Sequence, residues 1–222
     1  MLFFFLRQIC FYIHFFEHFI HLTLITLPTI TSKVCRIMEA QLIFPTIQTE
    51  RLNLVEIQQE HLNDIFLLFG DDKVTQYYNI KTFQKPQDGQ IYLDWFQNRF
   101  KEHAGIRWGI QLKGEEGIIG TIGYNNFAEN HRANIGYDLQ SAYWNKGYMT
   151  EASKAVFDFG FNNLHINRIE AEVMIGNTQS ERLLSKLGFQ NEGCLRDWMY
   201  WNNRHFDMTM FSLLRREWLS MS

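Results

Sequence analysis

One strand–turn–helix segment, residues 135–163, constrains the fold of this chain more than any other stretch. Residues 135–139 have the pattern of a strand, and apolar residues then recur at helical spacing from Ala152 to Phe161. The polar turn between them contains Gly147, which lets the backbone approach an anion because no Cβ intrudes. A helix start adds unpaired N–H groups and partial positive charge. The segment therefore predicts a phosphate or pyrophosphate site, although an ordinary strand–loop–helix connection has the same spacing.

Composition narrows the classes of function that remain open. The 222 residues suffice for one well-buried domain, or for one domain with an appendage. A net charge of −3 without a basic run argues against a nucleic-acid partner. The cysteines (Cys10, Cys35 and Cys194) form no Cys-x-x-Cys pair, and the histidines show no metal-ligand spacing. We therefore expect a cytoplasmic protein without a metal, in which Cys194 is a small buried residue.

Residues 1–38 form a hydrophobic N-terminal extension that differs from the rest of the chain. Residues 1–28 are long enough to cross a bilayer, which takes about 20 apolar residues. However, Glu17 and the histidines near the middle would be costly there, and a small-residue cleavage site is lacking. A translation start at Met38 or a disordered appendage is favoured over a membrane anchor, which would tether the protein to a membrane. The folded domain is expected over residues 39–222.

The rest of the chain has the pattern of one mixed α/β domain without an internal repeat or a linker. Helices are expected over 60–69, 86–103, from the polar turn to Asn163, and over 180–187. Strands are expected over 52–55, 107–112, 118–124, 130–139, 168–175, 190–200 and 205–214. The last two strands are joined by Asn202-Asn203.

The polar turn resembles the acyl-CoA pyrophosphate loop of the GNAT N-acetyltransferases, most closely the ribosomal-protein RimJ/RimL-type branch. The resemblance covers about residues 48–218, and two blocks in the expected order carry it. The first block consists of Ile135-Gly136-Tyr137, Tyr143-Trp144-Asn145-Lys146-Gly147-Tyr148 and Thr150-Glu151-Ala152. The second block consists of Asn167 to Val173, Asn177-Thr178-Gln179-Ser180, Lys186-Leu187-Gly188-Phe189 and Glu192-Gly193.

This resemblance implies an α/β (α+β) fold, a single GNAT-like domain. Its mixed, mostly antiparallel central sheet would have about seven strands, with helices on both faces. The implied activity is direct transfer of an acetyl group from acetyl-CoA to an amine. The acceptor would be the N-terminal α-amine of a (ribosomal) protein or a small-molecule amine, and the enzyme would be a monomer or a homodimer. Fold-level analogy does not choose between these acceptors.

The resemblance also implies which residues hold the cofactor. The pantetheine arm would run beside Tyr137, Asp138 and Leu139, and pair with their backbone like an added strand. Asn177 would contact the pantetheine, with a turn or helix-start role as its alternative. The pyrophosphate would bind the loop and the start of the helix. The implied cofactor-binding residues are Tyr137, Asp138, Leu139, Trp144, Asn145, Lys146, Gly147, Tyr148, Met149, Thr150, Asn177 and Ser180.

Three residues are candidates for the chemistry of N-acetyl transfer, which needs an oxyanion donor, a base and an acid. The amide of Leu139 would polarise the thioester carbonyl. Strand alternation places Glu170 and Glu172 on one face, and Glu172 matches the general-base position of the protein N-terminal acetyltransferases that the chain resembles. Its alternative is a solvated carboxylate. Ser180 is a candidate acid, but a role as N-cap of the 180–187 helix is the simpler expectation.

Two departures from the family pattern keep a non-catalytic interpretation open. Leu184 stands where many GNAT enzymes have a tyrosine acid, so the group that protonates the leaving thiolate is not identified. Asn134 stands where many relatives have a glutamate, and an amide cannot accept a proton. The alternative function is therefore a regulatory domain that binds acyl-CoA without turnover.

The acceptor site is the least defined part of the sequence. Its loops are expected at about residues 74–86 and 125–131. Several large aromatic residues could line it, although most are expected to pack in the core because of their area. These are Tyr77, Tyr78, Trp95, Trp108, Tyr124, Trp198, Tyr200 and Trp201.

Overall fold

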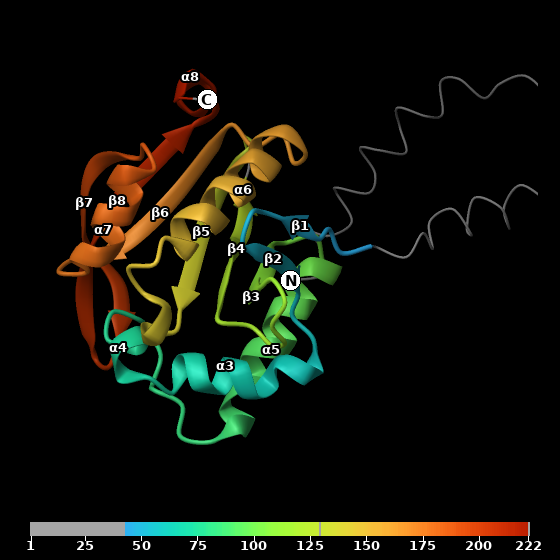
Figure 1. The fold of residues 1–222 in the computed structure, drawn as a ribbon. Coiled ribbons are helices and arrows are strands. Elements are labelled where there is room, and N and C mark those ends of the chain that lie inside the picture. Colours follow the sequence, from blue (N-terminus) through green and yellow to red (C-terminus); the bar gives the residue numbers. More distant parts are fainter. Residues whose placement is uncertain (1–42, 129, 222) are drawn as a thin grey trace, which may run out of the picture. The chain divides into compact units, whose positions relative to one another are not determined.

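An eight-stranded sheet organises residues 43–128 and 130–221, the residues that this computed structural model describes (Figure 1). The strand order is β1-β2-β3-β4-β5-β6-β8-β7, and β5 and β6 form its one parallel pair among the described strands. The predicted mixed, mostly antiparallel sheet is confirmed, with the short β1 as an addition. The strands are β1 (Ile47–Gln48), β2 (Leu52–Glu56), β3 (Ile106–Leu112), β4 (Gly120–Ala128), β5 (Arg132–Leu139), β6 (Arg168–Met174), β7 (Gln190–Trp201) and β8 (Arg204–Leu214).

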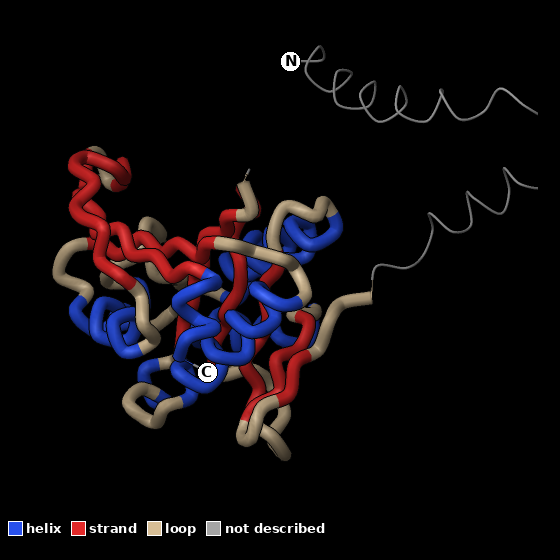
Figure 2. Tube along the Cα trace, turned by 90° about the horizontal axis from the view of Figure 1, so that it is seen from above, coloured by secondary structure: helices blue, strands red, loops and turns tan. Residues whose placement is uncertain are grey.

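Helices lie on both sides of the strands, as the fold class predicts (Figure 2). They are α3 (Leu62–Phe69), α4 (Asp72–Thr75), α5 (Pro86–Lys101), α6 (Tyr148–Asn162), α7 (Thr178–Lys186) and α8 (Arg215–Met221), with short 3₁₀ turns at Gln59–His61 and Ser141–Tyr143. The sequence did not indicate α4 or α8. Both are too short to show a helical repeat of apolar residues.

The expected N-terminal extension, residues 1–38, lies outside the described residues. In the part of the chain that the structure describes, no helix has the length and apolar character needed to cross a membrane.

Helix α7 begins earlier than the sequence predicts, and Ser180 is not its N-cap. The N-cap is Asn177, whose side-chain oxygen accepts a hydrogen bond from the Ser180 amide at 3.2 Å. Gly176 has φ of 98°, a left-handed conformation that turns the chain sharply after β6. The helix can therefore start at Thr178, and the Ser180 side chain is left for other contacts.

Two hydrophobic clusters cover opposite faces of the sheet. The larger cluster includes Leu54 of β2 together with Val156 and Phe157 of α6. The smaller cluster includes Ile65 of α3 and Leu93 of α5, and the next β2 residue after Leu54 packs against it. Because successive strand residues point to opposite faces, the sheet separates the α6 face from the α3–α5 face.

Strands β5 and β6 pair only at their beginnings and then diverge toward the end of the sheet near α4 (Figure 1). The last aligned pair is Asn134 with Glu170. On the other side of β5, the Gln140 amide donates to the Ile119 carbonyl at 2.9 Å, in register with the β4–β5 ladder. Because antiparallel hydrogen bonds alternate, the backbone groups of residues 137 and 139 then point away from β4, into the β5–β6 opening.

Candidate active site

The loop between β5 and α6 ends in a helix start without a side-chain cap. Gly147 is the N-cap, with φ of 82°, and its carbonyl accepts from the Glu151 amide at 3.0 Å. Asn145 is also left-handed, with φ of 60°. The amides of the first turn therefore have no intrahelical acceptor, and the helix dipole adds positive charge to them. This geometry suits an anion such as a pyrophosphate.

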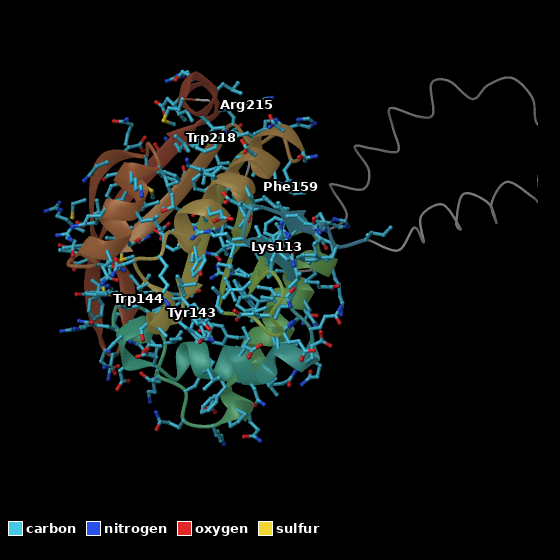
Figure 3. All side chains as sticks on the ribbon, in the orientation of Figure 1. Lys113, Tyr143, Trp144, Phe159, Arg215 and Trp218 are labelled. Atoms are coloured by element: carbon cyan, nitrogen blue, oxygen red, sulfur yellow. The ribbon has the colours of Figure 1, made fainter. Side chains whose placement is uncertain are left out.

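The side chains of the loop fold back toward β5 and toward each other. Trp144 Nε1 donates to the carbonyl oxygen of Leu139 at 2.7 Å. The ammonium of Lys146 lies 5.2 Å from the ring centroid of Tyr143, within cation–π range. In Figure 3, Tyr143 and Trp144 lie well apart from Trp218, on the side of the domain toward α3. The structure thus brings the predicted loop residues and Leu139 together.

A hydrogen bond connects the same loop to helix α4. Ser141 Oγ donates to Asp71 Oδ2 at 2.5 Å, and Asp71 Oδ1 accepts from the Lys73 amide at 2.9 Å. The Ser141 hydroxyl lowers the pKa of Asp71, which stays ionised at neutral pH. The Asp71 carboxylate therefore links the β5–α6 loop to α4, where the expected acceptor loop of about residues 74–86 begins.

Two hydroxyl groups meet on the α6 side of β5. Tyr137 Oη and Ser180 Oγ lie 2.5 Å apart, and they join β5 to the first turn of α7. Burial raises the pKa of Tyr137, and the Ser180 hydroxyl opposes this shift. Leu184, at the position where many GNAT enzymes have a tyrosine acid, is fully buried in the core. Ser180 and Tyr137 are therefore the hydroxyl groups that the structure brings to the start of α7.

Asp138 points to the opposite face of β5, where its residue is 4 % exposed. Its carboxylate accepts hydrogen bonds from the Arg107 guanidinium, from Thr121 Oγ1 at 3.2 Å and from Tyr78 Oη at 3.2 Å. Burial raises the pKa of Asp138, while Arg107 and the two hydroxyl groups oppose the shift. The carboxylate is thus engaged away from the opening, and by the alternation of the β4–β5 ladder the backbone groups of Asp138 point to β4.

This buried network continues to Asn134. Arg107 Nη1 donates to Asn125 Oδ1 at 2.9 Å, and Asn125 Nδ2 donates to Asn134 Oδ1 at 2.9 Å. Sequence analysis missed the role of Arg107, although a charged residue within an apolar strand was a usable signal. Such a residue must find a partner when it is buried, and Asp138 is the corresponding carboxylate in β5.

The two glutamates of β6 share a face but differ in their partners. Glu170 Oε1 is 2.6 Å from Arg168 Nε and 3.3 Å from Arg132 Nη1. Glu172 Oε2 instead accepts a neutral hydrogen bond from Trp198 Nε1 at 3.0 Å. The structure confirms the predicted alternation, with Ile169 and Ala171 buried between the glutamates. Glu170 is thus held by two arginines, whereas Glu172 is bound by a neutral indole, which suits a proton acceptor.

A bulge in β7 directs Trp198 to Glu172. Residues 196–198 lie opposite Asp207 alone, because Leu195 pairs with Met208 and the next pair starts at Met199. Asp197 is left-handed, with φ of 51°, and its amide donates to Asp207 Oδ1 at 2.8 Å. Bulges often re-aim a side chain beside a functional site. Trp198 remains 54 % exposed, so that it lies at the surface next to the carboxylate.

The other aromatic candidates separate into core and surface residues. Trp108 and Tyr124 are buried, whereas Tyr200 is 62 % exposed on β7. Cys194, expected to be buried, is exposed on the same strand. Strand β7 lies at the edge of the sheet, where nothing in the described chain covers it as a further strand. The expectation that Cys194 is buried is therefore wrong.

The chain is similar to known acetyltransferases. A family model described as an acetyltransferase (GNAT) domain matches residues 51–190. The chain belongs to the GNAT acetyltransferase family. An uncharacterized N-acetyltransferase of Bacillus subtilis, YoaA, is 37% identical over 173 residues, which is 78% of this chain and 98% of that protein. This GNAT enzyme is therefore an N-acetyltransferase that uses acetyl-CoA.

More distant relatives extend the comparison. The [ribosomal protein uS5]-alanine N-acetyltransferase of Escherichia coli is 28% identical over 135 residues, which cover 60% of this chain and 70% of that protein. Among solved structures, a GNAT acetyltransferase from Bacillus anthracis has a TM-score of 0.70 at 24% identity, over 78% of this chain and all of that one. That structure shows the shared fold.

The residues present fit acetyl-CoA. The uncapped first turn of α6 offers amides to the pyrophosphate, and the β5–β6 opening offers a strand edge to the pantetheine. Within residues 43–128 and 130–221, no cluster of three histidine, cysteine or acidic side chains could hold a metal ion. The family and its named relatives favour the enzyme over the regulatory alternative that Asn134 and Leu184 left open.

Proposed function

We propose that this enzyme acetylates the N-terminal α-amine of a protein, and that the transfer takes place at the β5–β6 opening. The opening itself carries the proposal, because strand backbone from β5 and Glu172 from β6 border it. The E. coli relative that acts on an alanine of ribosomal protein uS5 supports a protein acceptor. The same proposal places the enzyme in the cytoplasm, where such acceptors are made.

In this proposal, the cofactor contacts are mainly backbone contacts. The amides of Asn145, Lys146, Gly147, Tyr148 and Met149 bind the pyrophosphate, and Trp144 and Thr150 flank it. The backbone groups of Tyr137 and Leu139 pair with the pantetheine arm, whereas those of Asp138, between them, point to β4. Asn177 uses its side-chain oxygen to cap α7, so its amide nitrogen is the group left for the pantetheine.

When bound, acetyl-CoA supplies an acetyl group activated as a thioester. The amide of Leu139 then donates to the carbonyl oxygen where negative charge develops. The Leu139 carbonyl is held by Trp144 Nε1, and this contact fixes the strand end from which the amide projects. A preorganised donor of this kind needs no reorientation during the reaction.

Two side chains would handle the protons. Glu172 accepts a proton from the acceptor ammonium, directly or through water, so that the amine can attack. Ser180 Oγ donates its proton to the departing thiolate, and Tyr137 Oη holds that hydroxyl at 2.5 Å. This arrangement accounts for the leucine at position 184, since another hydroxyl serves the leaving group.

The exposed wall beside Glu172 favours a peptide acceptor over a small amine in a closed pocket. Trp198 and Tyr200 are both more than half exposed on β7, and the Trp198 indole reaches Glu172 across β8. An extended peptide N-terminus can lie across such a surface and present its amine to the carboxylate. A small amine instead needs an enclosing site to gain affinity.

A panel of acceptors tests this proposal. The full chain would be mixed with acetyl-CoA and with peptides that start with Ala, Ser or Met, or with spermidine and an aminoglycoside. Thiol release and the mass of the product are measured. We expect release with a subset of the peptides and acetylation at their α-amine. Release with a small amine but with none of the peptides would contradict the acceptor assignment.

A further inference from the structure

A short segment before β2 contacts the first turn of α6. Glu151 Oε1 accepts hydrogen bonds from Thr49 Oγ1 at 2.6 Å and from the Arg51 amide at 2.8 Å. Glu151 Oε2 accepts from Arg51 Nε at 2.7 Å. Residues about 100 positions apart in sequence are thus joined at the helix start that borders the cofactor loop.

Arg51 also reaches the loop residues on both sides of Gly147. Arg51 Nη1 donates to the Lys146 carbonyl oxygen at 3.1 Å, and the guanidinium carbon lies 4.6 Å from the Tyr148 ring centroid. A Cβ placed on Gly147 would lie 3.3 Å from Arg51 Nη2. One guanidinium therefore packs against the turn from which the phosphate-binding amides emerge.

The contact with the Lys146 carbonyl has a consequence for the next amide. The carbonyl of Lys146 and the N–H of Gly147 belong to one planar peptide, in which they point in opposite directions. We infer that Arg51 is a positioning residue of the cofactor site: by holding the Lys146 carbonyl, it aims the Gly147 N–H at the pyrophosphate. This inference rests on the proposed position of the cofactor.

The turn needs such a restraint because glycine does not supply one. Gly147 has φ of 82°, and glycine reaches many other conformations at little cost. Without Arg51, the Lys146–Gly147 peptide could rotate and direct its carbonyl toward the anion. A carbonyl in place of an N–H would repel the phosphate oxygens.

Arg51 also compensates for a carboxylate at an anion-binding site. Burial raises the pKa of Glu151, but the hydrogen bonds from Thr49 and Arg51 outweigh this effect and lower it overall. Glu151 is thus ionised near neutral pH, close to the proposed pyrophosphate. The Arg51 guanidinium balances its charge.

The geometry requires an arginine rather than any cation. Nε donates to Glu151 while Nη1 donates to the Lys146 carbonyl, so that two edges of one rigid fork are used together. A lysine ammonium is a point charge on a flexible stem and cannot hold both acceptors in the same way. Arg51→Lys therefore keeps the positive charge but removes the two-point hold on Glu151 and the Lys146 carbonyl.

Calorimetric titration of the full chain with CoA tests the inference. We expect R51K and R51A each to bind CoA about tenfold more weakly than the unmodified chain, as for the loss of one hydrogen bond to a charged group. The same loss is expected with 3′-dephospho-CoA, which keeps the pyrophosphate. In turnover, the KM for acetyl-CoA should rise about as much while kcat is retained.

Matched variants control for charge and for folding. R216A removes an exposed arginine from α8, which lies well apart from Trp144 in Figure 3, and should leave CoA affinity unchanged. E151Q keeps one oxygen, which can accept from Thr49 Oγ1 and the Arg51 amide, but it loses the acceptor of Arg51 Nε. Because the contact of Arg51 Nη1 with the Lys146 carbonyl is kept, the loss of CoA affinity in E151Q should be smaller than in R51K. Thermal unfolding of each variant shows whether the domain remains folded.

Several results would overturn the inference. These are normal CoA affinity in R51K, a defect that disappears with 3′-dephospho-CoA, and a loss in E151Q as large as that in R51K. Normal affinity in R51K would show that Arg51 contributes to CoA binding only through its charge. A defect absent with 3′-dephospho-CoA would show that Arg51 contacts the 3′-phosphate. An equal loss in E151Q would show that the ion pair with Glu151, and not the contact with the Lys146 carbonyl, matters for CoA binding. Failure of the unmodified chain to bind CoA would instead refute the proposed cofactor site.

Discussion

At the scale of single residues, Glu170 and Glu172 show how neighbours determine the role of a carboxylate. They lie two positions apart on the same face of β6, but Glu170 is paired with two arginines, whereas Glu172 accepts a hydrogen bond from an indole. An ion-paired carboxylate is a poor proton acceptor because its charge is already stabilised. The structure thus provides a candidate base and a matched control on one strand.

Glu172→Gln should lower kcat/KM for the acceptor at least about 100-fold, the usual contribution of a general base. CoA affinity should not change, because the proposed pyrophosphate site lies at the start of α6, away from Glu172. Steady-state kinetics and calorimetry measure the two effects separately.

Glu170→Gln is the control for this change. It removes the same charge from the same face of β6 but takes an ion-paired carboxylate, so turnover should be largely kept. Equal losses of turnover in the two variants would contradict the assignment of Glu172.

At the scale of secondary-structure elements, the start of α6 is the proposed site of the cofactor pyrophosphate. Gly147→Glu should abolish CoA binding, because a side chain and a negative charge would occupy the anion site. Gly114 has the same φ of 82° and open space around it, so Gly114→Glu imposes similar backbone strain elsewhere. Calorimetry should therefore show normal CoA binding in G114E. Equal CoA affinities of G147E and G114E would refute the proposed pyrophosphate site at the start of α6.

A second set of contacts joins the beginnings of β6, β7 and the end of β8. Glu192 accepts hydrogen bonds from Arg168 Nη1 at 2.7 Å and from Ser212 Oγ at 2.6 Å. These contacts, Arg168 first, lower the pKa of Glu192 to about 2. Because this value lies below that of the unfolded chain, about 4.3, the stabilisation is complete above that pH and is lost as the pH falls toward 2.

Glu192→Gln should therefore lower the free energy of unfolding at neutral pH, by at most about 1 kcal/mol since the side chain is 40% exposed. The difference from the unmodified chain should narrow as the pH falls below about 4.3. Urea unfolding at neutral and acidic pH measures it. A difference that stays constant with pH would show that the carboxylate charge is not involved.

At the scale of the whole molecule, local features were predictable and long-range ones were not. The turn before α6 and the hairpin at Asn202-Asn203 follow from adjacent residues, and both asparagines take the left-handed conformation that such a two-residue turn requires. The start of α7 was misplaced because Asn177 and Ser180 are similarly good caps. The sharp turn at Gly176, which precedes both residues, decides that the helix starts after Asn177.

The opening of the sheet and the buried polar network depend on tertiary structure. Strands β5 and β6 both look like ordinary strands, and their divergence after Asn134 appears only when they are paired. Likewise, Arg107 and Asp138 are 31 positions apart, and each alone reads as an unexplained charge in an apolar strand. The contact of Arg51 with Lys146 spans 95 positions and leaves no local pattern.

The most direct test of this account is amide hydrogen exchange of the full chain with and without acetyl-CoA. The account predicts slower exchange over residues 137–150 and 177–180, where backbone amides would bind the cofactor. A rival location exists, an open cavity of about 420 Å³ lined by Asp72, Lys73, Thr75, Gln76 and Thr82. Protection of residues 72–82 without protection of residues 137–150 would contradict the proposed site.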